Sequence, residues 1–105
     1  MLKDLTKIPS KELVTGIRAR FVHTDTFTLG YVTIDEGAEL PEHSHIHEQT
    51  SQVLEGELEM TIGGKTSILK PGMLAVIPSN VKHSAKALTA CKVNDTFCPV
   101  REDYK

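Results

Sequence analysis

Alternation of apolar and polar residues between Val53 and Ile62 is the feature that most constrains the fold of this chain. Successive side chains of a strand point to opposite faces, so this pattern predicts one strand with an apolar face and an acidic, solvated face. The apolar parity holds Leu54, Leu58, Met60 and Ile62, and the polar parity holds Glu55, Glu57, Glu59 and Thr61. Gly63-Gly64 follows, which predicts a two-residue hairpin turn and a return strand over 65–69, because both glycines accept positive φ.

Short strand-like runs cover most of the remaining sequence, whereas helical periodicity is nearly absent. We expect further strands over 17–22, 27–35, 38–40, 73–77, 81–88 and 90–97, and one short turn over 9–13. The run Met73–Ile77 is apolar throughout, which is typical of a strand buried on both faces. The connections are too short for parallel crossovers, so the pattern predicts an all-β sandwich or barrel with antiparallel strands.

Size and composition limit the organisation and the partners. The 105 residues are enough for one domain and too few for two, so we expect a single domain over 1–105 with its core barrel at about 15–98. The net charge is −2 and no Lys/Arg stripe occurs, which argues against nucleic acid and membrane surfaces as partners. No signal-peptide or membrane-spanning pattern is present, so we expect a cytoplasmic protein in which Cys91 and Cys98 are free thiols.

Three of the five histidines lie close together at His43, His45 and His47. They share parity, so in an extended segment all three would point to one face and two imidazoles could meet one ion. Neutral imidazole suits Zn, Fe, Ni and Cu. The alternative is a histidine-rich surface loop. His23 lies outside this cluster, and we interpret it as a surface histidine at a strand end.

The wider spacing resembles the paired motifs of the cupin superfamily. Gly37-x5-His43-x-His45-x3-Gln49-x6-Gly56 precedes Gly72-x5-Pro78-x-Asn80-x2-His83. Asn80 stands where the family has Gly, a mild change because Asn tolerates left-handed geometry, and Ala87 stands where Asn is common. The resemblance implies an all-β double-stranded β-helix, or jelly-roll barrel, and a homodimer. It also implies one divalent metal ion (Ni, Zn, Fe or Mn) inside the barrel, held by His43, His45, Gln49 and His83.

Gln49 replaces the glutamate that is usual in this motif. An amide oxygen can still ligate a metal but brings no charge, so the ion would keep its full formal charge and attract an anionic substrate. The same change weakens the interpretation as an iron oxygenase, because the two-histidine-one-carboxylate triad needs a carboxylate. His47 could support the ligands from outside the coordination sphere, act as an acid or base, or replace a ligand, and we favour the first of these roles.

A narrower resemblance involves the end of the chain. Together with His45-Ile46-His47-Glu48-Gln49, the pattern Asp95-x-Phe97-x3-Arg101-x-Asp103 is similar to that of small pectin-degradation cupins of the KdgF type. Those proteins ketonise 4,5-unsaturated uronates, which implies a small anionic substrate, a sugar acid, for this chain. The resemblance assigns catalytic roles to Asp95, Phe97 and Arg101. On composition alone, this segment would be a solvated edge strand and tail.

Two other functional classes stay open from the sequence. The chain could be a metal cupin that binds a small anion without turning it over, or another metal-dependent cupin enzyme such as a dioxygenase or a different sugar isomerase. A barrel without metal is a third alternative, which the four aligned ligand positions disfavour.

Overall fold

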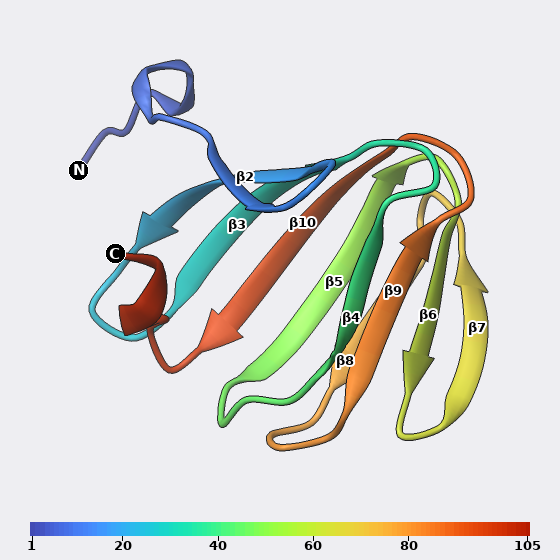
Figure 1. Ribbon diagram of the computed structural model, residues 1–105. Coiled ribbons are helices and arrows are strands. Elements are labelled where there is room, and N and C mark those ends of the chain that lie inside the picture. The colour runs from blue at the N-terminus through green and yellow to red at the C-terminus, as the bar shows by residue number, and fades with distance from the viewer.

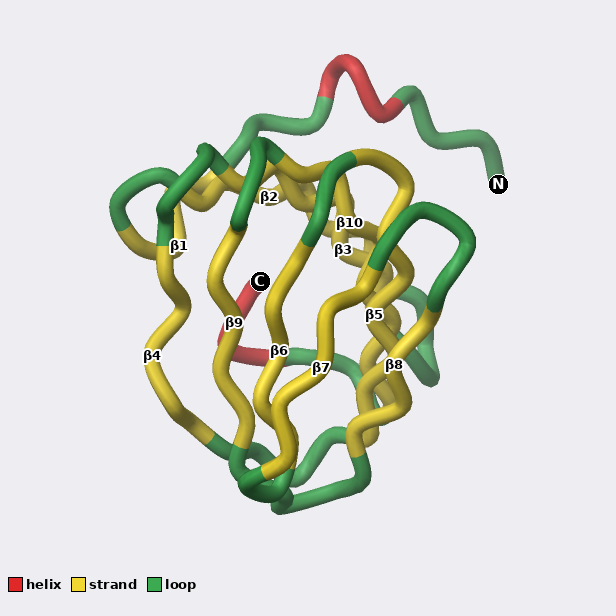
Figure 2. Tube along the Cα trace, turned by 90° about the vertical axis from the view of Figure 1, so that its right-hand side faces the viewer, coloured by secondary structure: helices red, strands yellow, loops and turns green.

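The computed structural model describes all residues, 1–105, as two facing antiparallel sheets (Figure 1). The larger sheet has the strand order β1-β2-β3-β10-β5-β8 and the smaller has the order β4-β9-β6-β7. Figure 2 shows the smaller sheet in front, the larger sheet behind it and the N-terminal residues projecting away from both. The all-β jelly roll is therefore confirmed, and every strand pair is antiparallel.

Ten strands and two short 3₁₀ helices make up the fold. The strands are β1 (Lys11–Val14), β2 (Ile17–His23), β3 (Thr28–Ile34), β4 (Glu39–His43), β5 (Glu48–Glu55), β6 (Leu58–Ile62), β7 (Lys65–Leu69), β8 (Leu74–Ile77), β9 (His83–Ala87) and β10 (Cys91–Cys98). The helices are η1 (Leu5–Lys7) and η2 (Glu102–Tyr104). The expected turn over 9–13 is wrong, because the N-terminal helical turn η1 lies earlier and Lys11 already begins a strand. No helix is long and apolar enough to cross a membrane.

The hairpin at Gly63-Gly64 is confirmed. β6 and β7 pair directly up to Ile62 and Lys65, and the two glycines between them have φ of 56° and 83°. A turn in which both central residues have positive φ matches the right-handed twist of the flanking strands.

The prediction of one strand over 53–62 is wrong, because the chain breaks at Gly56 into β5 and β6. These strands belong to different sheets, so the parity of the buried side chains changes across the break. Val53 is fully buried and Leu54 is 45 % exposed, whereas Leu58 is buried. Gly56 has φ of +85°, and a Cβ atom there would lie 2.2 Å from the carbonyl oxygen of Ala90. This contact explains why the break needs glycine.

The prediction that 73–77 is buried on both faces is also wrong. β8 forms an edge of the larger sheet and pairs only with β5. Only one of its faces meets the core, so Ile77 is fully buried while Leu74 and Val76 are 52 % and 56 % exposed. Periodicity could not reveal this arrangement, because both parities of the run are apolar.

The core fills the space between the two sheets. Its buried hydrophobic side chains come from most of the strands and are Ile17, Ala19, Phe21, Val32, Ile34, Val53, Leu58, Met60, Leu69, Ile77, Ala87, Cys91, Val93 and Phe97. Five polar residues are buried as well: Thr28, Gln49, Ser51, His83 and Arg101. Burying a polar group costs free energy of folding unless the group is hydrogen-bonded. These five residues are therefore the candidates for a functional site. Cys91 and Cys98 are free thiols, as expected.

Candidate metal centre

Three histidines from separate segments converge inside the barrel. His43 ends β4, His83 begins β9, and these two residues are directly paired in the ladder between the strands. His45 reaches the same point from the loop between β4 and β5. One potential ligand atom from each of the three lies within 4.8 Å of the others. The ring centroids of His43 and His83 are 4.1 Å apart, and those of His45 and His83 are 4.9 Å apart.

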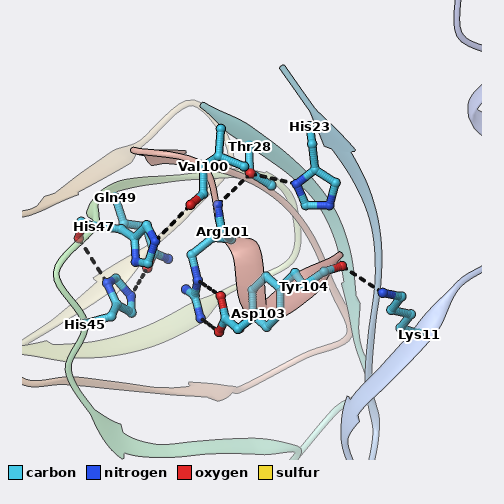
Figure 3. A network of polar contacts seen from close by, with 10 residues as sticks. All are labelled: Lys11, His23, Thr28, His45, His47, Gln49, Val100, Arg101, Asp103 and Tyr104. Carbon is cyan, nitrogen blue, oxygen red and sulfur yellow. Dashed lines mark hydrogen bonds and ion pairs between the residues drawn. The ribbon is translucent and has the colours of Figure 1, made fainter. Parts of the chain in front are cut away.

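Each of the three rings is held in the same way. The Nδ1 atoms of His43, His45 and His83 lie 2.8, 2.9 and 2.9 Å from the backbone carbonyl oxygens of Pro41, His47 and Val81, always two residues away. A carbonyl can only accept, so each Nδ1 carries the proton and donates it. The Nε2 atoms of neutral rings are then bare acceptors, which is the form that ligates metals. Figure 3 shows this contact for His45.

Two orphaned acceptors show that the cluster fits a cation. Nε2 of His83 is buried and has no hydrogen-bond partner. Nε2 of His45 lies 3.0 Å from Oε1 of Gln49, so two acceptor atoms face each other with no proton between them. Two ligands that each lie about 2.1 Å from one ion are about 3 Å apart when they subtend a right angle. A divalent metal ion satisfies both groups, and the all-neutral nitrogen and oxygen donor set suits a borderline transition metal.

The surroundings of His45 and His83 favour their neutral forms. Burial lowers the pKa of His45, and the positive charge of Arg101 lowers it further. Burial is also the main cause of the lowered pKa of His83. Both imidazoles therefore stay unprotonated to more acidic pH than a free histidine, which removes proton competition for a metal near neutral pH.

The loop between β8 and β9 is hydrogen-bonded to the segment that carries His45. The backbone N–H of Asn80 donates to the carbonyl of His45 at 2.8 Å, and the hydroxyl of Ser79 donates to the carbonyl of Ile46 at 2.5 Å. Asn80 has φ of 65°, the left-handed conformation that the sequence led us to expect. The segment that carries His45 is thus fixed to the segment that leads to His83.

Strand register places the predicted catalytic pair beside Gln49. Phe97 lies opposite Gln49, and Asp95 lies opposite Ser51, in the ladder between β10 and β5. Residues two apart share a face, so all four side chains point toward the interior. The hydroxyl of Ser51 accepts from Nε2 of Gln49 at 2.9 Å and donates to Oδ1 of Asp95 at 2.7 Å. A chain of hydrogen bonds therefore joins the histidine cluster to Asp95.

Asp95 has an unusual carboxyl. Protein atoms surround this group, although the residue as a whole keeps some exposure. Burial raises the pKa of Asp95 to about 6, against the lowering effects of hydrogen bonds from Ser51 and Gln49 and of the charge on Arg101. A carboxyl with a pKa near neutrality can both take up and release a proton, which is the property that a general acid–base needs.

Arg101 is buried and held from several sides. Its Nε and Nη2 donate to the two carboxylate oxygens of Asp103 at 3.0 and 2.8 Å (Figure 3). Its guanidinium carbon lies 4.0 Å from the ring centroid of Tyr104 and 4.8 Å from that of Phe97. The backbone N–H of Arg101 donates to the hydroxyl of Thr28. The hydrogen bonds to Asp103 use Nε and one N–H of Nη2, and neither engages Nη1.

A cavity of about 50 Å³ adjoins most of these groups. Apolar core residues line most of it, and its polar lining is His43, Gln49, Ser51, His83, Asp95, Arg101 and Tyr104. At roughly 10–15 Å³ for each water position, this space holds a few water molecules. The structure thus brings together every predicted ligand and every predicted catalytic residue. His45 contacts this set through Gln49 and through the ring of Phe97, whose centroid lies 5.9 Å away.

The two remaining histidines lie outside the group of three, although the ring of His47 lies edge-on to that of His45 at a centroid distance of 5.5 Å. His47 supports His45 through its backbone carbonyl, while its own Nε2 faces the carbonyl of Val100 at 3.2 Å. His23 ends β2 half-buried, with Nδ1 against the hydroxyl of Thr28.

Two residues of the site were missed by the sequence reasoning, Ser51 and Tyr104. Ser51 shares the parity of Gln49, so the sequence places both side chains on one face of a strand. That Ser51 meets Asp95 follows only from the pairing of β5 with β10. Tyr104 lies in η2, beyond the strands, and stacks on Phe21 at a centroid distance of 4.4 Å. Nothing in the local sequence indicates that the tail folds back in this way.

Comparison with known proteins agrees with this geometry. The cupin domain model matches residues 30–97. KdgF from Halomonas sp. is 30 % identical in sequence, with a TM-score of 0.89 and coverage of 95 % of this chain and 94 % of that one. An RmlC-like cupin from Shewanella frigidimarina is 28 % identical, with a TM-score of 0.92 and coverage of 98 % and 94 %.

More distant matches show the fold alone. Ectoine synthase from P. lautus is 23 % identical, with a TM-score of 0.85 and coverage of 96 % of this chain and 79 % of that one. No curated protein sequence gives a significant match. The match over residues 30–97, the jelly roll and the histidine cluster agree, and the chain belongs to the cupin family.

Proposed function

We propose that this chain is a metal-dependent cupin enzyme that ketonises a small 4,5-unsaturated uronate. One observation carries the proposal: Asp95 and Arg101 line the same cavity as His43, Gln49 and His83. An acid–base group and a cationic group thus lie beside a metal-type donor cluster. The resemblance to KdgF from Halomonas sp. supports the choice of substrate class.

The reaction is an isomerisation, so its atoms balance without a co-reactant. The bond between C1 and the ring oxygen breaks, the hydroxyl on C1 loses a proton to become an aldehyde oxygen, and C4 gains a proton as C5 becomes a ketone. A divalent ion held by His43, His45, Gln49 and His83 would supply Lewis-acid stabilisation of the negative charge that develops on substrate oxygen.

The protein's own groups have distinct roles in this proposal. The guanidinium hydrogens of Arg101 that Asp103 does not engage bind the substrate carboxylate, while Asp103 fixes the plane of the guanidinium. A carboxylate oxygen of Asp95 takes up the proton released at C1 and delivers one to C4. General acid–base catalysis of this kind contributes about 10²–10⁴-fold in rate. Phe97 packs against the sugar ring.

The size of the cavity sets a condition on substrate entry. A monosaccharide is larger than the few waters that the space holds, so the side chains that line it must shift when substrate binds. Tyr104 lies outside the strands, in the C-terminal turn η2, and we propose that its side chain shifts, which would break its stacking on the ring of Phe21.

The test follows the absorbance of an unsaturated galacturonate in the presence of metal-loaded protein. The expected result is decay well above a buffer blank, and decay equal to the blank would reject the proposed activity. Asp95→Asn should keep the metal and lose the activity. Thermal stabilisation by the uronate without any turnover would instead favour a binding protein, and oxygen uptake under iron loading would favour a dioxygenase.

We also propose a homodimer, by resemblance to other cupins. Static light scattering of the purified protein tests it, with an expected mass of twice that of one chain. The mass of a single chain would contradict it.

A further inference from the structure

We propose that Ser51 is a positioning residue that sets which end of the Gln49 side-chain amide faces the metal site. The inference rests on the metal site of the proposed function and not on its substrate. Its basis is the pair of hydrogen bonds at Ser51 Oγ, one to Nε2 of Gln49 at 2.9 Å and one to Oδ1 of Asp95 at 2.7 Å.

The orientation of this amide matters because its two ends differ chemically. The oxygen and the NH₂ group of a glutamine have similar size and shape, so packing alone does not distinguish them. Only the oxygen has lone pairs that can ligate a cation. If the amide were reversed, the NH₂ group would face Nε2 of His45 and the site would lose one ligand.

The polarity of the hydrogen bonds fixes the orientation. The ionised carboxylate of Asp95 can only accept, so the hydroxyl of Ser51 donates its single proton to it. The oxygen of Ser51 is then left as an acceptor for its second neighbour. Gln49 must therefore present its NH₂ group to Ser51, which turns Oε1 toward the histidines, 3.0 Å from Nε2 of His45.

Burial makes this arrangement firm. Ser51 is 2 % exposed and Gln49 is 6 % exposed, so water has little access to replace either bond. The strand register adds to this, because Ser51 lies directly opposite Asp95 in the ladder between β5 and β10. The hydroxyl is thus held between its two partners by the backbone itself.

The inference leads to a test by metal affinity alone. Co²⁺ binding would be measured by competition with a chromophoric chelator, together with the visible d–d absorption bands that report the ligand set. Ser51→Ala removes the hydroxyl oxygen that accepts from the NH₂ group of the amide at 2.9 Å. Loss of such outer partners typically costs about 10–100-fold in metal affinity, and the d–d bands should change as the amide oxygen leaves the ion.

A double-mutant cycle separates positioning from general damage to the site. In the Gln49→Leu background there is no amide to orient, so adding Ser51→Ala should change Co²⁺ affinity by less than about twofold. Thr50→Ala is the matched control, because Thr50 is the neighbouring residue on the opposite face of β5. It should leave Co²⁺ affinity unchanged.

The outcomes distinguish this inference from the proposed function. If the wild type binds no Co²⁺, the metal site and the inference both fail. If the wild type binds Co²⁺ and Ser51→Ala binds it equally well, the positioning role is wrong while the metal site stands. The same holds if Ser51→Ala lowers Co²⁺ affinity by the same factor whether residue 49 is Gln or Leu. A loss confined to the Gln49 background, with shifted d–d bands, supports it.

Discussion

His43 and His83 face each other across the ladder between β4 and β9, with ring centroids 4.1 Å apart and Nε2 of His83 buried without a partner. His83→Leu removes this unsatisfied atom but also the hydrogen bond from Nδ1 to Val81. Since an unsatisfied buried group costs about 1–3 kcal/mol and a typical hydrogen bond contributes about 1 kcal/mol, we expect the metal-free variant to be about as stable as the wild type.

The metal response of this variant should differ sharply from its stability. Ni²⁺ at 100 times its dissociation constant would stabilise the wild type by about 2.7 kcal/mol, and His83→Leu should lose most of that gain. Thermal unfolding with EDTA and with Ni²⁺ measures both effects. His23→Leu is the control and should respond to Ni²⁺ like the wild type. An equal Ni²⁺ response in His83→Leu would remove His83 from the ligand set.

Asp103 should act on substrate binding through Arg101. The carboxylate accepts two hydrogen bonds from the guanidinium, and these bonds are the main cause of the lowered pKa of Asp103. Asp103→Ala frees the guanidinium to rotate, so we expect KM for the uronate to rise about tenfold with a smaller change in kcat, as for a lost charged hydrogen bond.

Steady-state kinetics over a range of uronate concentrations measure the Asp103 effect. Glu102→Gln is the matched control, because Glu102 is adjacent and exposed and pairs with Lys105 rather than with Arg101. It should keep the wild-type KM. A KM unchanged in Asp103→Ala would show that Arg101 needs no such support.

Asp95 should give the metal-free protein a distinctive pH dependence. Burial raises the pKa of Asp95 from 3.8 to about 6, so folding takes up a proton between these values. The free energy of unfolding contributed by this group therefore falls as pH rises through that window and is constant above it. Asp95→Asn should lack this fall, so its free energy of unfolding should rise relative to that of the wild type between about pH 4 and pH 6.

Urea unfolding of both proteins in EDTA across this pH range checks the effect. The difference in free energy of unfolding between Asp95→Asn and the wild type should grow with pH and then level off. Parallel curves across the window would mean that the carboxyl titrates normally and is poorly suited to carry a proton near neutral pH.

Gly56 should tolerate substitution far less than Gly64. Both have positive φ, near 85° and 83°, so alanine is strained at either position by about 1–2 kcal/mol. At Gly64 an added Cβ atom meets nothing within 4 Å, whereas at Gly56 it would lie 2.2 Å from the carbonyl oxygen of Ala90. Gly56→Ala should therefore lose clearly more stability in urea unfolding. Equal losses would show that the backbone at Gly56 shifts freely.

The hairpin and the ligand positions could be predicted from the sequence because both depend on local patterns. Gly63-Gly64 determines a turn by its own backbone freedom, and the spacing of the histidines repeats a family pattern. The ladder between β4 and β9 then places His43 opposite His83. No property of the isolated segments indicates this pairing, so the convergence could be expected only through resemblance.

Other parts of the molecule could not be predicted, for physical reasons. β8 is apolar on both parities, so its place at a sheet edge depends on which strands pair and not on its own sequence. The break at Gly56 depends on the close approach of Ala90, which is distant in sequence. Ser51 is an ordinary strand serine until β10 sets Asp95 opposite it.

We expect His43, His45, Gln49 and His83 to bind one divalent metal ion together, and metal analysis measures this binding. The wild type and the triple variant His43→Ala, His45→Ala, His83→Ala would be incubated with Ni²⁺, dialysed and assayed by mass spectrometry for metal per chain. The expected result is one ion for each wild-type chain and none for the variant. No bound ion in the wild type, or equal amounts in both proteins, would contradict it.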